Sequence, residues 1–496
     1  MTYRAPVKDM LFCMTELARL DEVARLPGFE DFGADTAQAV LEECAKFNEG
    51  VVAPLNVDGD VRPSTLKDGV VTTTAGFKDA FRQFGEGGWQ GLQHPAAFGG
   101  QGLPKTIGAA CIEMLNSANL SFALCPLLTD GAIEALLTAG SAEQQQTYLP
   151  KLIDGSWTGT MNLTEPQAGS DLALVRSRAE PQPDGTYKIF GTKIFITYGE
   201  HDMAENIVHL VLARVAGAPE GVKGISLFVV PKFLVNADGS LGARNPIFCT
   251  GIEHKMGIHG NATCQISLEG AHGFLVGEPN KGLAAMFIMM NAARIGVGMQ
   301  GLGLTEAAYQ HAAAYAKERI QMRSLSGPKH PDQPADPIIV HPDVRKMLLT
   351  ARAYAEGGRA LAMWTTLQID KELGTDDDDV RADCADLVAL ITPIVKAFLT
   401  DNAWIASSHC LQVFGGHGYI RETGAEQFVR DARINMIYEG TNTIQALDLL
   451  GRKVLGDNGR KLKKFGKLVA DFVDQEGTNE AMQEFVNPLA DLGDKV

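Results

Sequence analysis

The spacing of apolar residues divides the chain into regions with helical periodicity and a region typical of β-strands. From about residue 7 to 153 apolar positions recur at helical spacing, as in AQAVLEECAKFNEGVV and AACIEMLNSANLSFALCPLL, with glycine-rich breaks between them. Between about 156 and 277 short β-branched and aromatic runs follow, such as TYKIFGTKIFIT and NIVHLVLARV. This pattern predicts an α+β protein with an N-terminal helical domain at 1–155 and a middle β-domain at 156–278.

From about residue 281 the helical period returns in segments long enough for a bundle, which predicts a C-terminal four-helix bundle at 279–450. Within it, the proline-rich stretch SLSGPKHPDQPADP at 324–337 predicts a loop, and TDDDDV at 375–380 predicts a solvated turn. Residues 451–496 predict a helical tail extension. Because no obvious helix cap precedes its end, we expect this extension to be incomplete.

Composition and charge narrow the class of protein. The chain has 496 residues, of which 45% are hydrophobic and 21% charged, as in globular proteins. A net charge of −16 argues against nucleic acid or an anionic membrane surface as a main partner. Charges interrupt the apolar runs at the N-terminus, no segment is expected to approach a membrane-spanning length, and eight cysteines without a CxxC pair argue against disulfides or structural zinc. We therefore expect a cytoplasmic protein without a membrane span.

Three tempting motifs lack the context that their chemistry needs. GVGMQG at 296–301 matches a dinucleotide-binding pattern but follows a helical run rather than a strand, so we expect close helix packing instead of NAD binding. His254, His259 and Cys264 match no common zinc spacing, so we expect turn residues that bond backbone and no metal site. Ser170 lies in GSD, without the GxSxG context of a nucleophile.

The stretch MIYEGTNTIQ at 436–445 isolates one carboxylate, Glu439. Thr441 can cap a helix whose core face is expected to carry Ile444, Leu447, Leu450 and Val454. Glu439 then lies just outside the helix on a glycine-hinged turn, where partial desolvation would raise its pKa toward the range of a general base. A surface glutamate that favours the positive end of the helix is the alternative.

Two glycine-rich turns are further candidates. NLTEPQAGSDLA at 162–173 can bring backbone amides close to a flat heterocycle or a phosphate, although an ordinary turn has the same composition. LQVFGGHGYIRE at 411–422 follows a long helix, and taken alone it indicates a helix C-cap.

Read in order, TEPQAGSD, KIFIT, ERIQMR, QVFGGHGY and RDARINMIYEGTNTIQ resemble motifs of the acyl-CoA dehydrogenase family of flavoproteins, over residues 164–445. The opening YRAPVKDM and the 324–337 insertion look like the branch that includes 3-methylmercaptopropionyl-CoA dehydrogenases. The resemblance implies FAD between the β-domain and the bundle and oxidation of an acyl-CoA to the trans-2-enoyl-CoA. It gives Glu439 the role of catalytic base and flavin N5 the role of hydride acceptor, with an electron-transfer flavoprotein as the electron acceptor.

The resemblance also implies binding residues. Arg319 matches the arginine that holds the FAD pyrophosphate, and Gln412, Gly415 and Gly416 match a turn that reaches the adenosine half across a dimer interface. Two departures occur, because Phe195 stands where the family more often has Trp, and Met322 and the insertion follow Arg319 where the family commonly has Phe-Gly. The implied flavin contacts are Met161, Leu163, Thr164, Ser170, Phe195, Ile196, Thr197, Arg319, Gln412, Gly415, Gly416, Thr441 and Thr443, and the implied substrate contacts are Ser170, Asn291, Arg294 and Gly440.

Two rival functions stay open at this stage. An acyl-CoA oxidase would pass the electrons to oxygen, and a catalytically silent relative would only bind acyl-CoA. The resemblance further implies a homodimer or a dimer of dimers. It favours a short, medium or sulfur-containing acyl group, such as 3-methylmercaptopropionyl, without selecting one.

Overall fold

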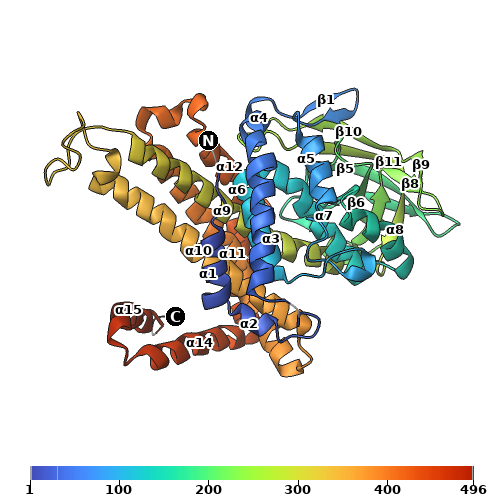
Figure 1. Ribbon diagram of the computed structural model, residues 1–496. Helices are drawn as coiled ribbons and strands as arrows, with labels where there is room; N and C mark the ends of the chain where they lie inside the picture. Colours follow the sequence, from blue (N-terminus) through green and yellow to red (C-terminus); the bar gives the residue numbers. More distant parts are fainter. Residues whose placement is uncertain (1–2, 31, 494, 496) are drawn as a thin grey trace.

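The computed structural model describes residues 3–30, 32–493 and 495, and its N-terminal part is helical (Figure 1). Two of these helices, α6 and α7, are buried along most of their length. Asn119 caps α7 by accepting a hydrogen bond from Phe122 N at 3.1 Å, as an N-cap side chain should. The helices are α1 (Val7–Phe12), α2 (Leu20–Val23), α3 (Ala34–Phe47), α4 (Asn56–Val61), α5 (Phe77–Glu86), α6 (Lys105–Ala118), α7 (Leu120–Ala139) and α8 (Ala142–Ile153), and β1 (Thr65–Lys67) pairs with β2 (Val70–Thr72).

A seven-stranded sheet follows, with the order β10-β11-β5-β4-β6-β3, in which β7 pairs with both β11 and β6. The pairings are antiparallel except for β3 with β6 and β4 with β6. Helix α7 lies directly on β3, because a Cβ added at Gly159 would be 2.4 Å from the Cβ of Ala132. The strands are β3 (Trp157–Asn162), β4 (Arg178–Pro181), β5 (Tyr187–Thr197), β6 (Asn206–Val215), β7 (Ser226–Pro231), β8 (Phe233–Val235), β9 (Leu241–Arg244), β10 (Ile247–Ile252) and β11 (Thr263–Val276).

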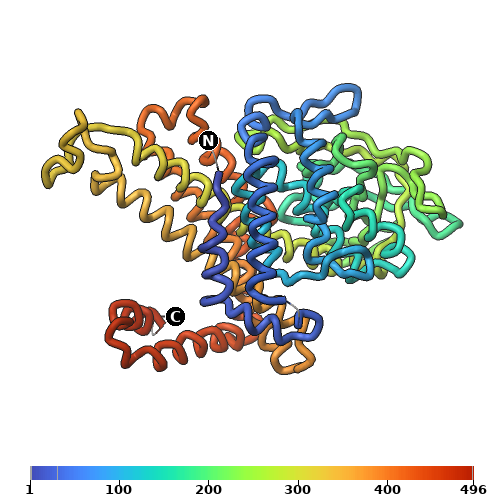
Figure 2. Tube along the Cα trace, viewed as in Figure 1, coloured from blue at the N-terminus to red at the C-terminus, as the bar shows by residue number. Residues whose placement is uncertain are grey.

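The C-terminal part is a helical bundle, as its period predicted. Helices α9 (Gly282–Glu318), α10 (Pro342–Gly374) and α11 (Asp378–Val413) pack on one another, and α12 (Ala425–Asn435) packs on α9 and α11. Figure 2 shows these segments crossing beside the N-terminal helices α1 and α3. The short α13 (Asn442–Leu447) follows α12, and α14 (Arg460–Glu476) and α15 (Gln483–Gly493) form the end of the described chain.

The glycines of GVGMQG lie inside α9 and bring neighbouring helices close. A Cβ at Gly296 would be 2.4 Å from Leu127 Cδ1 of α7, and a Cβ at Gly298 would be 2.8 Å from Val395 Cγ1 of α11. A Cβ at Gly301 would be 2.7 Å from the carbonyl oxygen of Leu399 in α11. The prediction of glycines for close helix packing is therefore confirmed.

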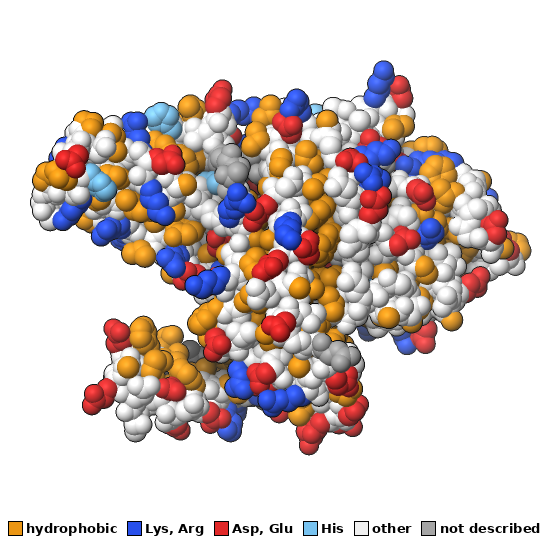
Figure 3. Space-filling view, viewed as in Figure 1, with side chains coloured by type: hydrophobic (Ala, Val, Ile, Leu, Met, Phe, Trp, Pro, Cys, Tyr) orange, Lys and Arg blue, Asp and Glu red, His pale blue; other side chains and the backbone are white. Residues whose placement is uncertain are grey.

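Helices α14 and α15 project from the body, and exposed apolar side chains gather on this projection (Figure 3). The base of the projection is tied to α11, where Lys464 Nζ lies 2.6 Å from Asp386 Oδ2 and Arg460 also pairs with Asp386. The exposed large hydrophobic residues of the projection include Leu468, Phe472, Phe485 and Leu492.

Helices α7 and α9 are both long and apolar enough to cross a membrane by length and composition, so the expectation that no segment approaches that length was wrong. In the most apolar window, 78% of the α7 residues and 56% of the α9 residues are buried inside the protein, as in core helices. Core burial therefore accounts for their apolar character without a membrane.

The cysteine and histidine expectations can also be compared with the structure. All eight cysteines are free and buried. His259 bonds the carbonyl of Lys255 at 2.7 Å and pairs with Asp60 Oδ1 at 2.8 Å, so it is a backbone-bonding turn residue as predicted. Among the described residues, no group of three or more His, Cys, Asp or Glu side chains could hold a metal ion.

Candidate active site

Glu439 lies on the turn between α12 and α13 with a left-handed backbone, at φ 54°. This conformation is uncommon for a residue with a side chain and is found preferentially at functional sites. Gly440 follows at φ 80°, and a Cβ there would be 2.7 Å from Gln445 Nε2, so the turn needs glycine. Gln445 is 1% exposed and donates to the Gly440 carbonyl at 3.0 Å, which holds the turn in this shape.

The Glu439 carboxylate makes no hydrogen bond or ion pair with any residue that the structure describes. Burial raises its pKa to about 7, while the positive charges of Lys396 and then Arg294 lower it. Lys396 is itself fully buried and donates to Asn442 Oδ1 at 2.8 Å. The turn thus holds a carboxylate that can accept a proton near neutral pH.

Thr441 caps α13, as predicted, by accepting a hydrogen bond from Ile444 N at 3.3 Å. The predicted core face of this helix was wrong in part, because Leu447 is 63% exposed and Leu450 is 59% exposed, whereas Ile444 and Val454 are half-buried. The α-helix ends at Leu447 and continues as a wider π-helix over Asp448–Val454. The buried positions of this segment are instead the polar residues Gln445 and Asp448, and Asp448 pairs with Arg294 of α9.

Arg294 and Asn291, the predicted substrate contacts on α9, line a cavity of about 490 Å³ between α6, α7, α9, α10 and α11. Arg294 is 4% exposed and pairs with Asp448 Oδ2 at 2.9 Å, while its Nε has no partner among the described residues. Apolar side chains such as Ile295 and Leu127 form much of the wall. The cavity therefore joins an apolar space to a buried cation that also acts on Glu439.

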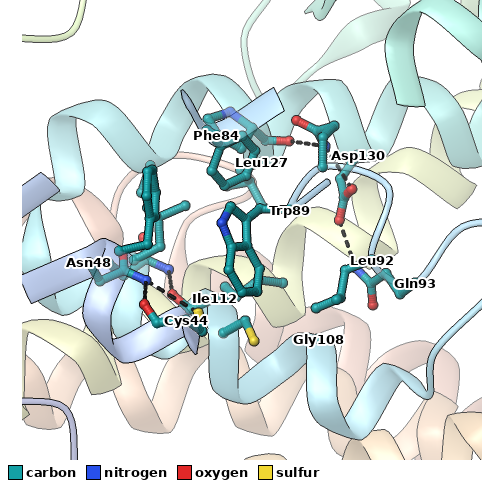
Figure 4. Close-up of a pocket in the computed structure, with 17 residues that line it drawn as sticks. Cys44, Asn48, Phe84, Trp89, Leu92, Gln93, Gly108, Ile112, Leu127 and Asp130 are labelled. Carbon is teal, nitrogen blue, oxygen red and sulfur yellow. Dashed lines mark hydrogen bonds between the residues drawn. The ribbon is translucent and has the colours of Figure 1, made fainter. Parts of the chain in front are cut away.

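A second, smaller chamber of about 50 Å³ adjoins this cavity. Figure 4 shows the Trp89 ring in the middle of the lining residues, with Asn48 and Cys44 on one side of it and Gln93 and Asp130 on the other. Its lining is largely aromatic and aliphatic. The two spaces meet at the residues that line both, which are Gln93, Ile112, Leu127 and Asp130.

The predicted flavin segments of the β-domain lie side by side. Ile194 N donates to the carbonyl of Thr164 at 3.0 Å, which brings the 161–164 segment against the 195–197 segment. Phe195 has φ 59° and is 58% exposed, so it presents an aromatic ring to open space from a strained backbone. Ser170 is exposed on the turn after β3, whereas the other predicted contacts are at least partly buried, namely Met161, Leu163, Ile196 and Thr197.

Arg319, Gln412, Gly415 and Gly416 line one hollow of about 580 Å³ at the C-terminal ends of α9 and α11. The Arg319 guanidinium pairs with no carboxylate in the described part of the chain. A Cβ at Gly415 or Gly416 would meet nothing within 4 Å, so the backbone faces open space. The hollow therefore brings four of the predicted residues together around an available cation. Thr443 is exposed near the start of α13 and does not line the hollow.

Three family models match the chain: the acyl-CoA dehydrogenase N-terminal domain at 34–156, the middle domain at 160–271 and the C-terminal domain at 280–455. The 3-methylmercaptopropionyl-CoA dehydrogenase of Ruegeria pomeroyi is 52% identical over 95% of this chain and 79% of its own length. The chain belongs to the acyl-CoA dehydrogenase family. It is an oxidoreductase of the flavoprotein type, as the resemblance implied.

Other relatives agree with this membership. The broad-specificity linear acyl-CoA dehydrogenase FadE5 of Mycobacterium tuberculosis is 37% identical over 96% of this chain and 79% of its own length. The solved structure of butyryl-CoA dehydrogenase from Megasphaera elsdenii has a TM-score of 0.66 at 24% identity and covers 84% of this chain and 97% of that one. This last likeness confirms the predicted fold of an acyl-CoA dehydrogenase.

The described residues fit a flavin. The unpaired Arg319 suits a pyrophosphate, since a guanidinium offers several donors in a fixed plane. The open backbone at Gly415 and Gly416 leaves room for a ligand to approach closely, and the exposed ring of Phe195 can lie against a flat heterocycle. These features agree with the flavoprotein character of the dehydrogenase family.

Two buried lysines, Lys396 and Lys193, were not identified from the sequence as residues of the dehydrogenase site. Lys396 is the only charged residue in the stretch 387–400, and a lone lysine inside a long apolar helix was the available signal. Lys193 is also fully buried, and it binds the Leu163 carbonyl at 3.0 Å and Glu165 Oε1 at 2.8 Å. It thereby ties the two predicted flavin segments of the β-domain together.

Proposed function

We propose that this dehydrogenase removes the α-proton of an acyl-CoA thioester with Glu439 and transfers the β-hydride to FAD, giving the trans-2-enoyl-CoA. The observation that carries the proposal is the unpaired Glu439 carboxylate, whose pKa burial raises to about 7. A base with a pKa near the working pH combines a useful deprotonated fraction with useful basicity. Bound FAD would supply the hydride acceptor at its N5 atom.

The turn also offers a donor for the substrate carbonyl. The backbone N–H of Glu439 donates to no acceptor within the described residues. An N–H aimed at the thioester oxygen would stabilise the negative charge that develops there as the α-proton leaves. Arg294, paired with Asp448, keeps a buried positive charge near the same turn and limits how far the pKa of Glu439 rises.

We assign the pyrophosphate–adenosine half of FAD and its isoalloxazine ring to two different surfaces of the protein. The hollow lined by Arg319, Gln412, Gly415 and Gly416 suits the pyrophosphate and adenosine half, and in an oligomer it can serve the FAD of a neighbouring subunit. The isoalloxazine ring is assigned to Phe195 and the adjacent predicted contacts. The remaining assigned contacts are Met161, Leu163, Thr164, Ser170, Ile196, Thr197, Thr441 and Thr443.

The proposed acyl-CoA site is the cavity lined by Asn291 and Arg294, with Gly440 at the catalytic turn and Ser170 on the CoA side. The small chamber beyond Leu127 is assigned to the end of the acyl chain. Its volume of about 50 Å³ suits a short chain end, which supports short acyl groups, including the 3-methylmercaptopropionyl group named for the Ruegeria relative.

Further parts of the proposal follow from family membership. The electron acceptor is an electron-transfer flavoprotein, the assembly is a homodimer or a dimer of dimers, and the protein is cytoplasmic. The working domain division is 1–155, 156–278, 279–450 and a tail at 451–496. A fully flavinated monomer in solution would contradict the proposed assembly.

The test uses the purified yellow protein and a panel of thioesters from propionyl-CoA to long-chain acyl-CoA, with 3-methylmercaptopropionyl-CoA included. We expect bleaching of the flavin band under nitrogen and transfer of electrons to an electron-transfer flavoprotein. Stoichiometric peroxide release in air would instead identify an oxidase. A protein without a flavin spectrum would identify a silent relative.

Leu127→Ala tests the assignment of the chain end. Removing this side chain joins the small chamber to the cavity, so kcat/KM should shift toward longer acyl groups. We expect a change of about 10-fold in relative kcat/KM, because one or two methylene groups in an apolar pocket contribute roughly 1–3 kcal/mol. Leu137→Ala, on the same helix and away from both spaces, is the control. An unchanged substrate order would contradict the assignment.

A further inference from the structure

The insertion between α9 and α10 is built around one buried carboxylate, Asp336. This residue is 0% exposed. Its Oδ1 accepts hydrogen bonds from Lys329 N at 3.0 Å and His330 N at 2.8 Å, and its Oδ2 accepts one from Ser324 N at 2.9 Å. The Arg323 guanidinium adds an ion pair at 3.3 Å. One side chain therefore fixes the backbone at three points of the insertion.

Backbone hydrogen bonds connect the segment around Asp336 to Arg319. The N–H of Asp336 donates to the Met322 carbonyl, and the carbonyl of Asp336 accepts from Gln321 N, both at 2.9 Å. Ile338 N then donates to the carbonyl of Arg319 itself at 2.8 Å. Gln321 and Ile338 line the same hollow as Arg319. The two ends of the insertion thus form part of the wall beside the available guanidinium.

The Arg319 backbone is held at α9 by its N–H, which donates to the Tyr315 carbonyl at 2.8 Å, whereas its side chain makes no ion pair within the described residues. Arg319 is the exposed C-cap residue of α9, with an extended backbone at ψ 118°. Ordering a free loop costs conformational entropy, so an unanchored insertion would leave the wall beside the Arg319 side chain variable. Burial raises the pKa of Asp336, but the surrounding donors outweigh it and lower the pKa to about 2, so the anchor stays ionised. Asp336 itself does not line the hollow.

We propose that Asp336 is a positioning residue for FAD: it anchors the insertion so that Arg319, Gln321 and Ile338 are already arranged around the hollow before the pyrophosphate binds. The inference rests on the proposed function, because it takes FAD as the occupant of that hollow. Asp336 acts through Arg319 and lies away from the catalytic turn. Its loss should therefore weaken FAD binding and leave proton transfer to Glu439 intact.

The test compares Asp336→Ala and the milder Asp336→Asn with Asp332→Ala as a matched control. Asp332 lies in the same insertion, is exposed, and accepts no side-chain hydrogen bond in the described residues. FAD is removed from each protein and titrated back while its fluorescence is followed. We expect affinity about 10-fold weaker in Asp336→Ala, a smaller loss in Asp336→Asn, and no change in the control.

Two further readouts separate positioning from general damage. Amide hydrogen exchange at Ser324, Lys329 and His330 should become faster in both Asp336 variants, because these amides lose their acceptor or its charge. With saturating FAD, kcat should return to within about twofold of wild type, as expected when only cofactor binding was impaired. Asp336→Asn keeps one acceptor oxygen and decides the matter if Asp336→Ala folds poorly.

Faster exchange with unchanged FAD affinity would overturn the inference, and so would a kcat that stays low at saturating FAD. Arg319→Ala separates this failure from that of the proposed function. If Arg319→Ala loses FAD while both Asp336 variants retain it, only the positioning role fails. If Arg319→Ala also retains FAD, the assignment of the hollow to FAD fails, and the inference fails with it.

Discussion

Two loop carboxylates of this protein, Glu439 and Asp336, have opposite surroundings. Asp336 accepts hydrogen bonds from three backbone N–H groups and forms an ion pair with Arg323. Burial alone would raise the pKa of Asp336, but these contacts lower it to about 2. Glu439 accepts no hydrogen bond from the described residues, and burial raises its pKa to about 7. The same functional group is thus a fixed anion in one turn and a proton acceptor in the other.

The difference lies in how each backbone turn is satisfied. The insertion wraps its amides around the Asp336 side chain, whereas the catalytic turn is held from outside, by Gln445 on the Gly440 carbonyl and by the Thr441 cap. Glu439 is therefore positioned without its own carboxylate being used. A turn that needs no hydrogen bond from its base leaves that base free for a substrate proton.

Glu439→Gln should give the largest effect, because it replaces the free proton acceptor with an amide of the same shape. Turnover with a good acyl-CoA should fall by about 10²- to 10⁴-fold, while FAD content and acyl-CoA binding stay close to wild type. Dye-coupled steady-state assays and a binding titration measure the two quantities. A parallel loss of binding would mean that Glu439 has a structural role.

Arg319→Ala removes the side chain that the Asp336 insertion is proposed to position. FAD retention should weaken by roughly 1.5–3 kcal/mol, or about 10- to 150-fold in affinity, since a charge-assisted contact is lost. Flavin occupancy after gel filtration measures this. Equal occupancy in variant and wild type would contradict the assignment.

The pH dependence of flavin reduction should follow Glu439 and not Asp336. The base works only when ionised, so the rate should be half-maximal near pH 7 and fall by up to about 10-fold per pH unit below it. Asp336 stays ionised across this range and should contribute no transition. A rate that does not change between mildly acidic and mildly alkaline pH would contradict a base with this pKa.

Lys396→Met should give the smallest effect. Its positive charge lowers the pKa of Glu439, so its removal should raise that pKa and move the acidic limb of the profile to higher pH. The rate above the transition should remain close to wild type. A shift to lower pH, or none, would show that Lys396 does not act on the base.

Much of this fold follows from local pattern. The period of apolar residues predicted the helical and strand regions, and the glycines of α9 were identified as packing residues because no strand precedes them. The face of the helix after Thr441 could not be predicted, because its buried positions are the polar residues Gln445 and Asp448, and the partner of Asp448 is Arg294 on the distant helix α9.

The site was predicted unevenly for physical reasons. Glu439 and its Thr441 cap have short-range signals in one turn. Lys396 and Arg294 act on that turn through their charges and Gln445 acts through a hydrogen bond, and these roles depend on three helices that only the tertiary structure brings together. The role of Asp336 could not be predicted, because the N–H groups that it binds lie six to twelve residues away along a loop without a periodic pattern.

The central claim is that Glu439 accepts the α-proton, and anaerobic rapid mixing tests it most directly. Wild-type and Glu439→Gln proteins with equal FAD content are mixed with a saturating acyl-CoA, and the flavin band is followed through a single turnover. This excludes any later transfer of electrons to an acceptor. The account predicts rapid bleaching in the wild type and a rate at least about 10²-fold lower in the variant. Bleaching of the variant within a few-fold of the wild-type rate would contradict it, because another group would then be the base.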